Sequence, residues 1–245
     1  MYRYYEDDAE EIAEIERLKN AFFAIKGNYQ VEALSTLYKE CEGFLIHNES
    51  EEIEDLLNIV VAVKSFFQTK EKDNAREVTK EVWKKLSTKY EMSLYDIRIL
   101  NPILFVAETP EEMFEVTQKC LEQLNRYRYN DLYVQLRMSM LFNLIHSFMD
   151  YKFSLKDKQF MTENNLNYVD VINEASDEIS ELNAKNELKY NIIVAFSVVY
   201  KAIANEDKIS FYSSIAFLKS LEVYEMVDDV IQFYLNKYNI NFKGS

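Results

Sequence analysis

Hydrophobic side chains recur along this chain at spacings of three and four residues, the period of one face of an α-helix. Two clear stripes open the chain, from Ile12 to Ile25 and from Val31 to Phe44. The pattern predicts about eleven helices in all. The later ones cover residues 53–67, 78–90, 94–106, 131–150, 168–182, 186–203, 207–222 and 224–238, with two more beginning near 110 and 155.

Capping residues mark several of these helix starts. The clearest signal is Thr109-Pro110-Glu111-Glu112, in which Thr109 caps, Pro110 takes the first helical position and Glu112 reaches back. Ser93 with Asp96 gives a similar signal, and residues 48–51 and 74–77 resemble capping boxes. Within 94–106, Pro102 removes a backbone hydrogen bond, which predicts either a kink or a helix boundary capped by Asn101.

Helices of about 15–20 residues joined by short polar turns form antiparallel hairpins that stack on one another. The starts near 29, 74, 110 and 155 have a spacing of about 36–45 residues, within the range of helical-hairpin repeats. We therefore predict an all-α fold, a degenerate tetratricopeptide-like right-handed solenoid of about eleven antiparallel helices. Because no linker composition divides the chain, residues 1–245 are predicted to form a single helical-repeat regulatory domain. Residues 1–8 would be flexible or capping, and 224–245 a capping or dimerisation helix.

Composition and charge exclude several classes of protein. Three glycines and two prolines in 245 residues are too few for a β-sandwich or barrel, and no Rossmann or P-loop motif occurs. A net charge of −14 argues against nucleic-acid binding by this chain. We expect a cytoplasmic protein that does not associate with a membrane, because no stretch of 18 apolar residues and no signal peptide is present.

Catalytic and metal-binding motifs are missing from the sequence. His47 and His146 belong to no metal-binding motif, and the two cysteines, Cys41 and Cys120, both fall in apolar helical stripes. Pairs of acidic residues lie at helix starts, where negative charge favours the helix dipole. We expect no enzyme activity, no metal and no cofactor.

The helix predicted over 131–150 is apolar almost all round, so it should be buried. It nevertheless carries one polar stripe at spacings of three and four residues: Gln135, Ser139, Asn143, His146 and Asp150. Buried polar groups are costly unless they are paired. The stripe therefore lines either a water-filled groove or a polar contact with a neighbouring helix or a dimer partner. Weaker polar positions within apolar helices are Arg98, Asn101 and Tyr200.

Three segments carry a recognisable order of motifs, residues 81–101, 137–147 and 217–238. Together they resemble the Rgg/GadR/MutR family of transcription regulators. Residues 81–101 resemble its stretch W-x-x-Y-E-x-x-L-F-x-N, and residues 137–147 are similar to its R-x-x-x-x-x-N-x-I-S helix. The tail, 217–238, is similar to the family's closing I-F-x-x-L-G-x-x-x-L-A helices. The matching residues include Trp83, Tyr90, Glu91, Asn101, Arg137 and Asn143.

The resemblance implies a cytoplasmic helical-repeat sensor from a Gram-positive bacterium that binds a short imported peptide in its concave face. Family members are usually homodimeric transcription factors with an N-terminal helix-turn-helix. Residues 1–28 are too short and too acidic for that domain, so DNA binding by this chain is not expected. Either the DNA-binding domain has been removed, or the protein is a natural stand-alone sensor.

Our first hypothesis is therefore a peptide-binding regulatory domain of a Rgg-like quorum-sensing regulator. Asn143 and Asn101 are expected to bind peptide backbone, and Arg137 or Arg98 a carboxylate. The candidate peptide-binding residues are Arg98, Asn101, Gln135, Arg137, Ser139, Asn143, His146 and Tyr200. The alternative is a stand-alone interaction module that binds or sequesters a paralogous regulator without a peptide.

The last prediction is a homodimer built on the C-terminal helices. The tail is more apolar than the terminal cap of a solenoid should be, and a two-fold contact is the commonest way to bury such a surface. The alternative is that the tail folds back on its own chain. The candidate dimerisation residues are Val223, Met226, Val227, Val230, Phe233 and Tyr234.

Overall fold

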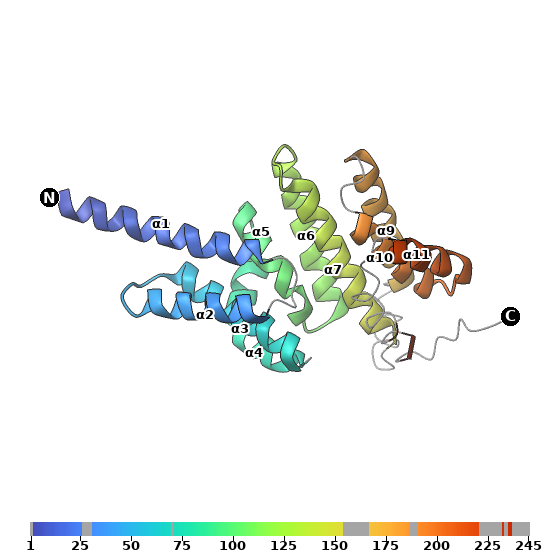
Figure 1. The fold of residues 1–245 in the computed structure, drawn as a ribbon, viewed down its shortest axis with the longest axis horizontal. Helices are drawn as coiled ribbons and strands as arrows, with labels where there is room; N and C mark the ends of the chain where they lie inside the picture. Colours follow the sequence, from blue (N-terminus) through green and yellow to red (C-terminus); the bar gives the residue numbers. More distant parts are fainter. Residues whose placement is uncertain are drawn as a thin grey trace. The chain divides into compact units, whose positions relative to one another are not determined.

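The computed structural model describes residues 2–25, 31–69, 71–153, 167–186 and 191–220, together with 232, 235 and 236. Within these residues every regular element is helical, with ten α-helices and two short 3-10 helices (Figure 1). The all-helical prediction is confirmed for this part of the chain. Contacts group the chain into two compact units, residues 1–107 and 108–245. The solenoid arrangement, the count of eleven helices and the single domain stay predictions.

Unit 1 is built around α3, which packs between α2 and α4, while α1 packs on α2 and α3. Its elements are α1 (Tyr2–Ala24), α2 (Val31–Leu45), α3 (Glu51–Thr69), α4 (Lys72–Thr88), α5 (Leu94–Leu100) and the 3-10 helix η1 (Asn101–Val106). The core combines the apolar stripes read from the sequence, including Leu18, Leu34, Leu37, Ile53, Leu56, Ile59 and Leu86. Helix α1 begins at Tyr2, well before its apolar stripe.

The helix starts in unit 1 follow local capping chemistry in part. At α5 the predicted capping box is present, with the Ser93 hydroxyl accepting from the Asp96 N–H and the Asp96 carboxylate accepting from the Ser93 N–H. The change of structure at Pro102 is also confirmed, since α5 ends and η1 follows. The capping box predicted at Asn74 is wrong. Helix α4 already begins at Lys72, and the Asn74 amide instead donates to the hydroxyl of Ser65 at 2.8 Å.

Unit 2 is arranged around α7, which packs on α6, α9 and α10, and α10 in turn packs on α9 and α11. Its elements are α6 (Pro110–Leu124), the 3-10 helix η2 (Asn125–Tyr127), α7 (Tyr133–Phe153), α9 (Tyr168–Lys185), α10 (Asn191–Ala204) and α11 (Lys208–Ser220). Thr109 caps α6 as predicted, because its hydroxyl accepts from the Glu112 N–H at 3.1 Å. The Glu112 carboxylate reaches back one residue further than expected, to the N–H of Glu108.

Helix α7 is as buried as its sequence predicts. Its fully buried side chains are Met138, Met140, Leu141, Leu144, Ile145, Phe148 and Met149. The side chain of Asp150, the predicted helix near 155 and all six candidate dimerisation residues lie outside the described residues: Val223, Met226, Val227, Val230, Phe233 and Tyr234. Among the helices that the structure describes, none is long and apolar enough to cross a membrane.

Candidate functional site

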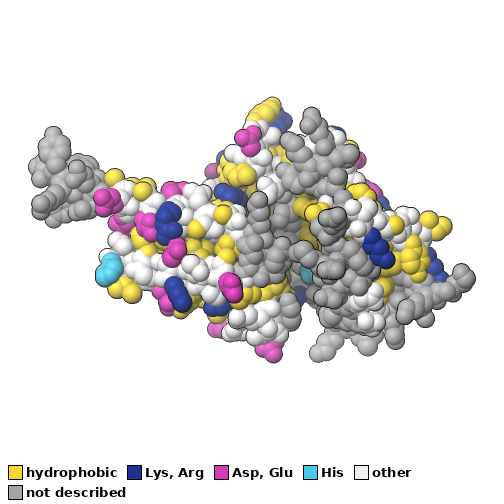
Figure 2. Space-filling model, in the orientation of Figure 1, with side chains coloured by type: hydrophobic (Ala, Val, Ile, Leu, Met, Phe, Trp, Pro, Cys, Tyr) yellow, Lys and Arg dark blue, Asp and Glu magenta, His cyan; other side chains and the backbone are white. Residues whose placement is uncertain are grey.

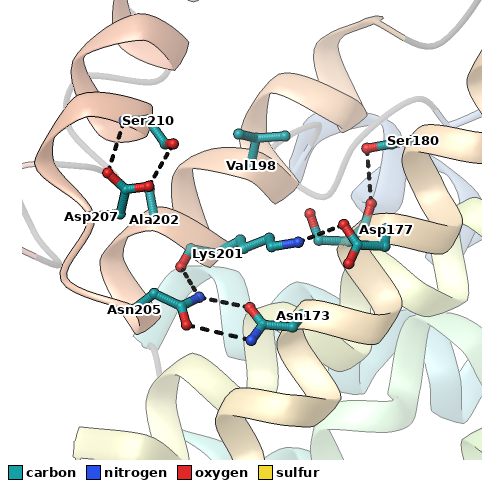
Figure 3. Close-up of a pocket in the computed structure, with 10 residues that line it drawn as sticks. Asn173, Asp177, Ser180, Val198, Lys201, Ala202, Asn205, Asp207 and Ser210 are labelled. Atoms are coloured by element: carbon teal, nitrogen blue, oxygen red, sulfur yellow. Dashed lines mark hydrogen bonds and ion pairs between the residues drawn. The ribbon is translucent and has the colours of Figure 1, made fainter.

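Unit 2 contains a polar groove over α10, between α9 and the start of α11, with a volume of about 590 Å³ (Figure 3). This volume lies within the range of ligand-binding pockets. The groove is lined by Asn173, Ser176, Asp177 and Ser180 of α9, by Val198, Lys201 and Ala202 of α10, and by Asn205, Asp207 and Ser210 beyond it.

The lining residues repeat one pattern on two neighbouring helices. Those from α9 are at positions 173, 176, 177 and 180, and those along α10 are at 198, 201, 202 and 205. Each set has the i, i+3, i+4, i+7 spacing of a single helix face, so two adjacent faces form one continuous surface. Nearly all of these side chains are small or polar, which makes the groove suitable for a hydrogen-bonding ligand.

A pair of amides joins the two helices at one end of the groove. The Asn205 amide donates to Oδ1 of Asn173 at 2.6 Å, and the Asn173 amide donates to Oδ1 of Asn205 at 3.4 Å (Figure 3). Asn205 also donates to the carbonyl of Lys201 at 2.8 Å, which holds its side chain against α10. Both amides therefore have a defined orientation at the edge of the cavity.

The turn after α10 places Asn205 and Asp207. Glu206 has a φ of 58°, in the left-handed region, and the N–H of Asp207 donates back to the carbonyl of Ala202 at 2.8 Å. These are the features of a helix C-terminus closed by a left-handed residue. Asp207 then caps α11 by accepting from the N–H groups of Ile209 and Ser210.

The charged groups of the groove all have partners within the chain. Lys201 forms an ion pair with Asp177 across the two helices (Figure 3). Hydrogen bonds from the hydroxyl and the N–H of Ser210, with a smaller effect from the Ile209 N–H, lower the pKa of Asp207. Lys201 and Asp177 therefore neutralise each other, while Asp207 keeps its negative charge within a set of hydrogen bonds. The amides and hydroxyls of the lining favour a hydrogen-bonding ligand such as a peptide backbone.

Below these groups the interface between α9 and α10 is polar but satisfied. The buried Ser176 hydroxyl donates to that of Ser197 at 3.3 Å, and Ser197 donates to the carbonyl of Val194 at 2.8 Å. Ser180 donates to the carbonyl of Ser176 at 2.9 Å. The base of the groove is thus held by the chain's own hydrogen bonds.

The predicted polar stripe of α7 faces a different surface of α10. Nδ1 of His146 lies 3.1 Å from the hydroxyl of Tyr200, and the ring of Phe142 contacts those of Phe196 and Tyr200. At about 100° per residue, positions 196 and 200 lie on the side of α10 opposite the groove stripe. The structure therefore brings together His146 and Tyr200, two of the residues predicted for one site. They form a contact between helices and do not line the groove.

The other predicted residues of α7 differ in accessibility. Gln135 is exposed, and Ser139 and Asn143 are half-buried. Arg137 binds Glu178 of α9 and also donates to the carbonyl of Leu121 at 3.1 Å. A ligand carboxylate at Arg137 would have to compete with Glu178.

The two predicted residues in unit 1 lie near the junction of α5 and η1. Asn101 is buried and forms the C-cap of α5, its N–H donating to the carbonyl of Ile97. The guanidinium of Arg98 lies over the ring of Phe23, with 3.5 Å between Cζ and the ring centroid.

Sequence reasoning missed the groove residues because their pattern resembles an ordinary solvated helix face. Asn173 and Asn205 are 32 positions apart, one within α9 and the other in the turn after α10, and the apolar stripe of each helix explains its neighbours. The available signal was the match between the polar stripes of two consecutive predicted helices.

Both cysteines are buried, and burial raises the pKa of the Cys41 thiol to about 11, so it stays protonated at neutral pH. Among the described residues no cluster of three or more His, Cys, Asp or Glu side chains is arranged to hold a metal ion.

Comparisons with protein-family models, curated proteins and solved structures find no match for this chain.

Proposed function

We propose that this chain is the peptide-sensing regulatory domain of a Rgg-like transcription regulator, and that unit 2 holds an extended peptide in the groove over α10. The observation that carries the proposal is the pair of aligned polar stripes on α9 and α10, joined at one end by the Asn173 and Asn205 amides. The regulatory role rests on the sequence resemblance of residues 81–101 and 137–147.

The chemistry of the two amides suits peptide backbone. A primary amide donates and accepts in the same plane, as a peptide group does. In their present contact Asn173 and Asn205 already make the exchange of hydrogen bonds that each would make with a peptide unit. From position 198 to position 205 the groove runs about 10 Å along α10, which accommodates about three residues of extended chain.

A ligand in this groove would act by shifting populations. It would contact α9, α10 and the first turn of α11 at once, so it would favour the conformers in which these helices keep their present arrangement. The proposed protein is a cytoplasmic homodimer that needs no cofactor and does not itself bind DNA. The protonated state of the buried Cys41 thiol supports a binding role rather than thiol catalysis.

The test is a screen of fluorescein-labelled random hexapeptides against the full chain by fluorescence polarisation. For the peptides that bind, Asn205→Ala is expected to weaken affinity about tenfold, because about two hydrogen bonds are lost. The matched control is Asn74→Ala, which removes an exposed asparagine whose hydrogen bond lies within unit 1.

A second variant, Asn143→Ala, separates the groove from the polar stripe of α7. Unchanged affinity in this variant removes Asn143 from the site, as the groove proposal expects. Weaker binding in Asn143→Ala with unchanged binding in Asn205→Ala would move the site to α7. No binding by any peptide would contradict the proposal.

A second candidate function, an interaction module without a peptide ligand, is favoured by the outer face of α11. Ile209, Tyr212 and Phe217 are 81%, 51% and 42% exposed, and Figure 2 shows hydrophobic side chains at the surface where α11 lies. Exposed apolar patches often mark protein contacts.

Sedimentation velocity tests this candidate together with the homodimer. A species near 29 kDa that persists at micromolar concentration would contradict self-association. A dimer that Tyr212→Ser and Phe217→Ser together dissociate would instead identify α11 as a contact surface. Dissociation by substitutions at Val227 and Val230 alone would assign the contact to the tail.

A further inference from the structure

Unit 1 contains a half-buried arginine whose charge is not matched by any carboxylate of the described chain. The guanidinium of Arg98 lies against the ring of Phe23, and this ring contact is its one interaction among the residues that the structure describes. Burial lowers the pKa of Arg98, and no neighbouring carboxylate raises it again. A partly desolvated charge without a partner is costly, so its retention calls for an explanation.

Three other arginines of the described chain each have a carboxylate partner. Arg17 is paired with both Glu14 and Glu40, and Arg137 is paired with Glu178. In unit 1, Arg76 donates to the carbonyls of Val106 and Ala107 and is paired with Asp73. With 42 acidic residues available, a partner for Arg98 would have been easy to supply.

The negative charge around α5 gathers near Tyr95, one turn before Arg98. Burial is the main cause of the raised pKa of Tyr95, and the carboxylates of Glu52, Asp55, Glu16 and Asp96 raise it further. The hydroxyl of Tyr95 is buried without a hydrogen-bond partner, and its ring also contacts that of Phe23. Arg98 and Tyr95 therefore share one aromatic contact but differ in charge environment.

Among the described residues, no acceptor binds the N–H donors of the Arg98 guanidinium. A guanidinium stacked on an aromatic ring uses its flat face, while its N–H donors point outward in the plane. Two parallel N–H groups match the two oxygens of a carboxylate. A net charge of −14 and the carboxylates near Tyr95 would penalise a dianion more than a monoanion.

We propose that Arg98, supported by the ring of Phe23, is a binding site for a carboxylate-bearing ligand. The site belongs to unit 1, so it does not depend on the groove of unit 2 and would survive the failure of that proposal.

The experiment follows the side-chain Nε–Hε signals of the full chain, labelled with ¹⁵N, during an acetate titration at constant ionic strength with chloride. The Arg98 signal, assigned by its loss in Arg98→Lys, is expected to shift saturably with a midpoint below about 100 mM. The Arg76 signal is the internal control, because its Nε already donates to Val106 at 2.8 Å. Inorganic phosphate at the same ionic strength is expected to bind more weakly.

Thermal unfolding gives a second readout. Acetate is expected to raise the melting temperature of the wild-type chain and of Arg128→Lys, since Arg128 is an exposed arginine stacked on Tyr129. The rise should be absent in Arg98→Lys. An Arg98 signal that moves no more than that of Arg76, equal melting shifts in all three proteins, or tighter binding of phosphate would each overturn the proposal.

Discussion

The two faces of α10 both carry polar groups but use them differently. On the face toward α7, Tyr200 is 1% exposed, and its hydroxyl is satisfied by His146 among aromatic rings. On the face toward the groove, Lys201 and Asn205 form hydrogen bonds at the protein surface and border a cavity. Polar groups on the first face help two helices to pack, whereas those on the second are accessible to a ligand.

This difference shows why polarity within an apolar helix is a weak guide to a binding site. A polar group that stands out in a buried helix must be paired, and the nearest partner is usually another helix of the same chain. A binding surface instead needs polar groups on the accessible side, where the sequence pattern looks ordinary. Four predictions test whether the two faces of α10 differ in this way.

The largest effect is expected for Tyr200→Ala. The substitution removes a buried ring that contacts Phe142, Phe196 and His146, so it should destabilise unit 2 by roughly 3–5 kcal/mol. Urea unfolding followed by circular dichroism measures the change. Val198→Ala, on the groove face, is the matched truncation and should cost about 1 kcal/mol or less. Equal costs would mean that both faces are core.

A smaller effect is expected for Tyr200→Phe, which removes the hydroxyl alone. His146 loses its hydrogen bond to Tyr200, and the free energy of unfolding should fall by about 0.5–1.5 kcal/mol. Peptide affinity should stay unchanged, because this hydroxyl lies on the side of α10 opposite the groove. A loss of affinity without a loss of stability would place Tyr200 in the binding site after all.

The interaction energy between the Asn173 and Asn205 side chains should be smaller than the stability changes expected for the two Tyr200 variants. A double-mutant cycle with alanine at both positions is expected to give an interaction energy of about 0.5 kcal/mol, because both amides are solvent-accessible. Urea unfolding of the four proteins measures it. A coupling above about 2 kcal/mol would show that the amide pair is a structural clamp rather than a ligand-binding pair.

The smallest effect concerns the pH response of Asp207 at the rim of the groove. Its pKa is below the ordinary value of 3.8 in the folded state, so its contribution to stability is present above that value and is lost as pH falls through the folded pKa. Ser210→Ala should raise the pKa toward 3.8, and a carboxyl ¹³C NMR titration would detect the shift. Ser213→Ala is the control, and an equal shift there would contradict the assignment to Ser210.

Several features of this protein follow from the sequence alone. The helical stripes and the capping chemistry at Ser93 and Thr109 depend on residues within one turn of each other, so local reading finds them. The end of α5 before Pro102 is local for the same reason, since the ring removes a hydrogen bond wherever the helix lies. The burial of α7 follows from its composition, because a helix that is apolar all round needs neighbours on every side.

Tertiary structure decided which polar groups meet. The amide pair of Asn173 and Asn205, the contact of His146 with Tyr200 and the ring under Arg98 each join residues from segments far apart in the sequence. Their distances depend on how helices rotate and slide against one another, which is set by the packing of many apolar side chains and not by any single residue. The sequence therefore determined the helices and most of their buried faces, while packing alone decided which polar faces became interior contacts and which became a groove.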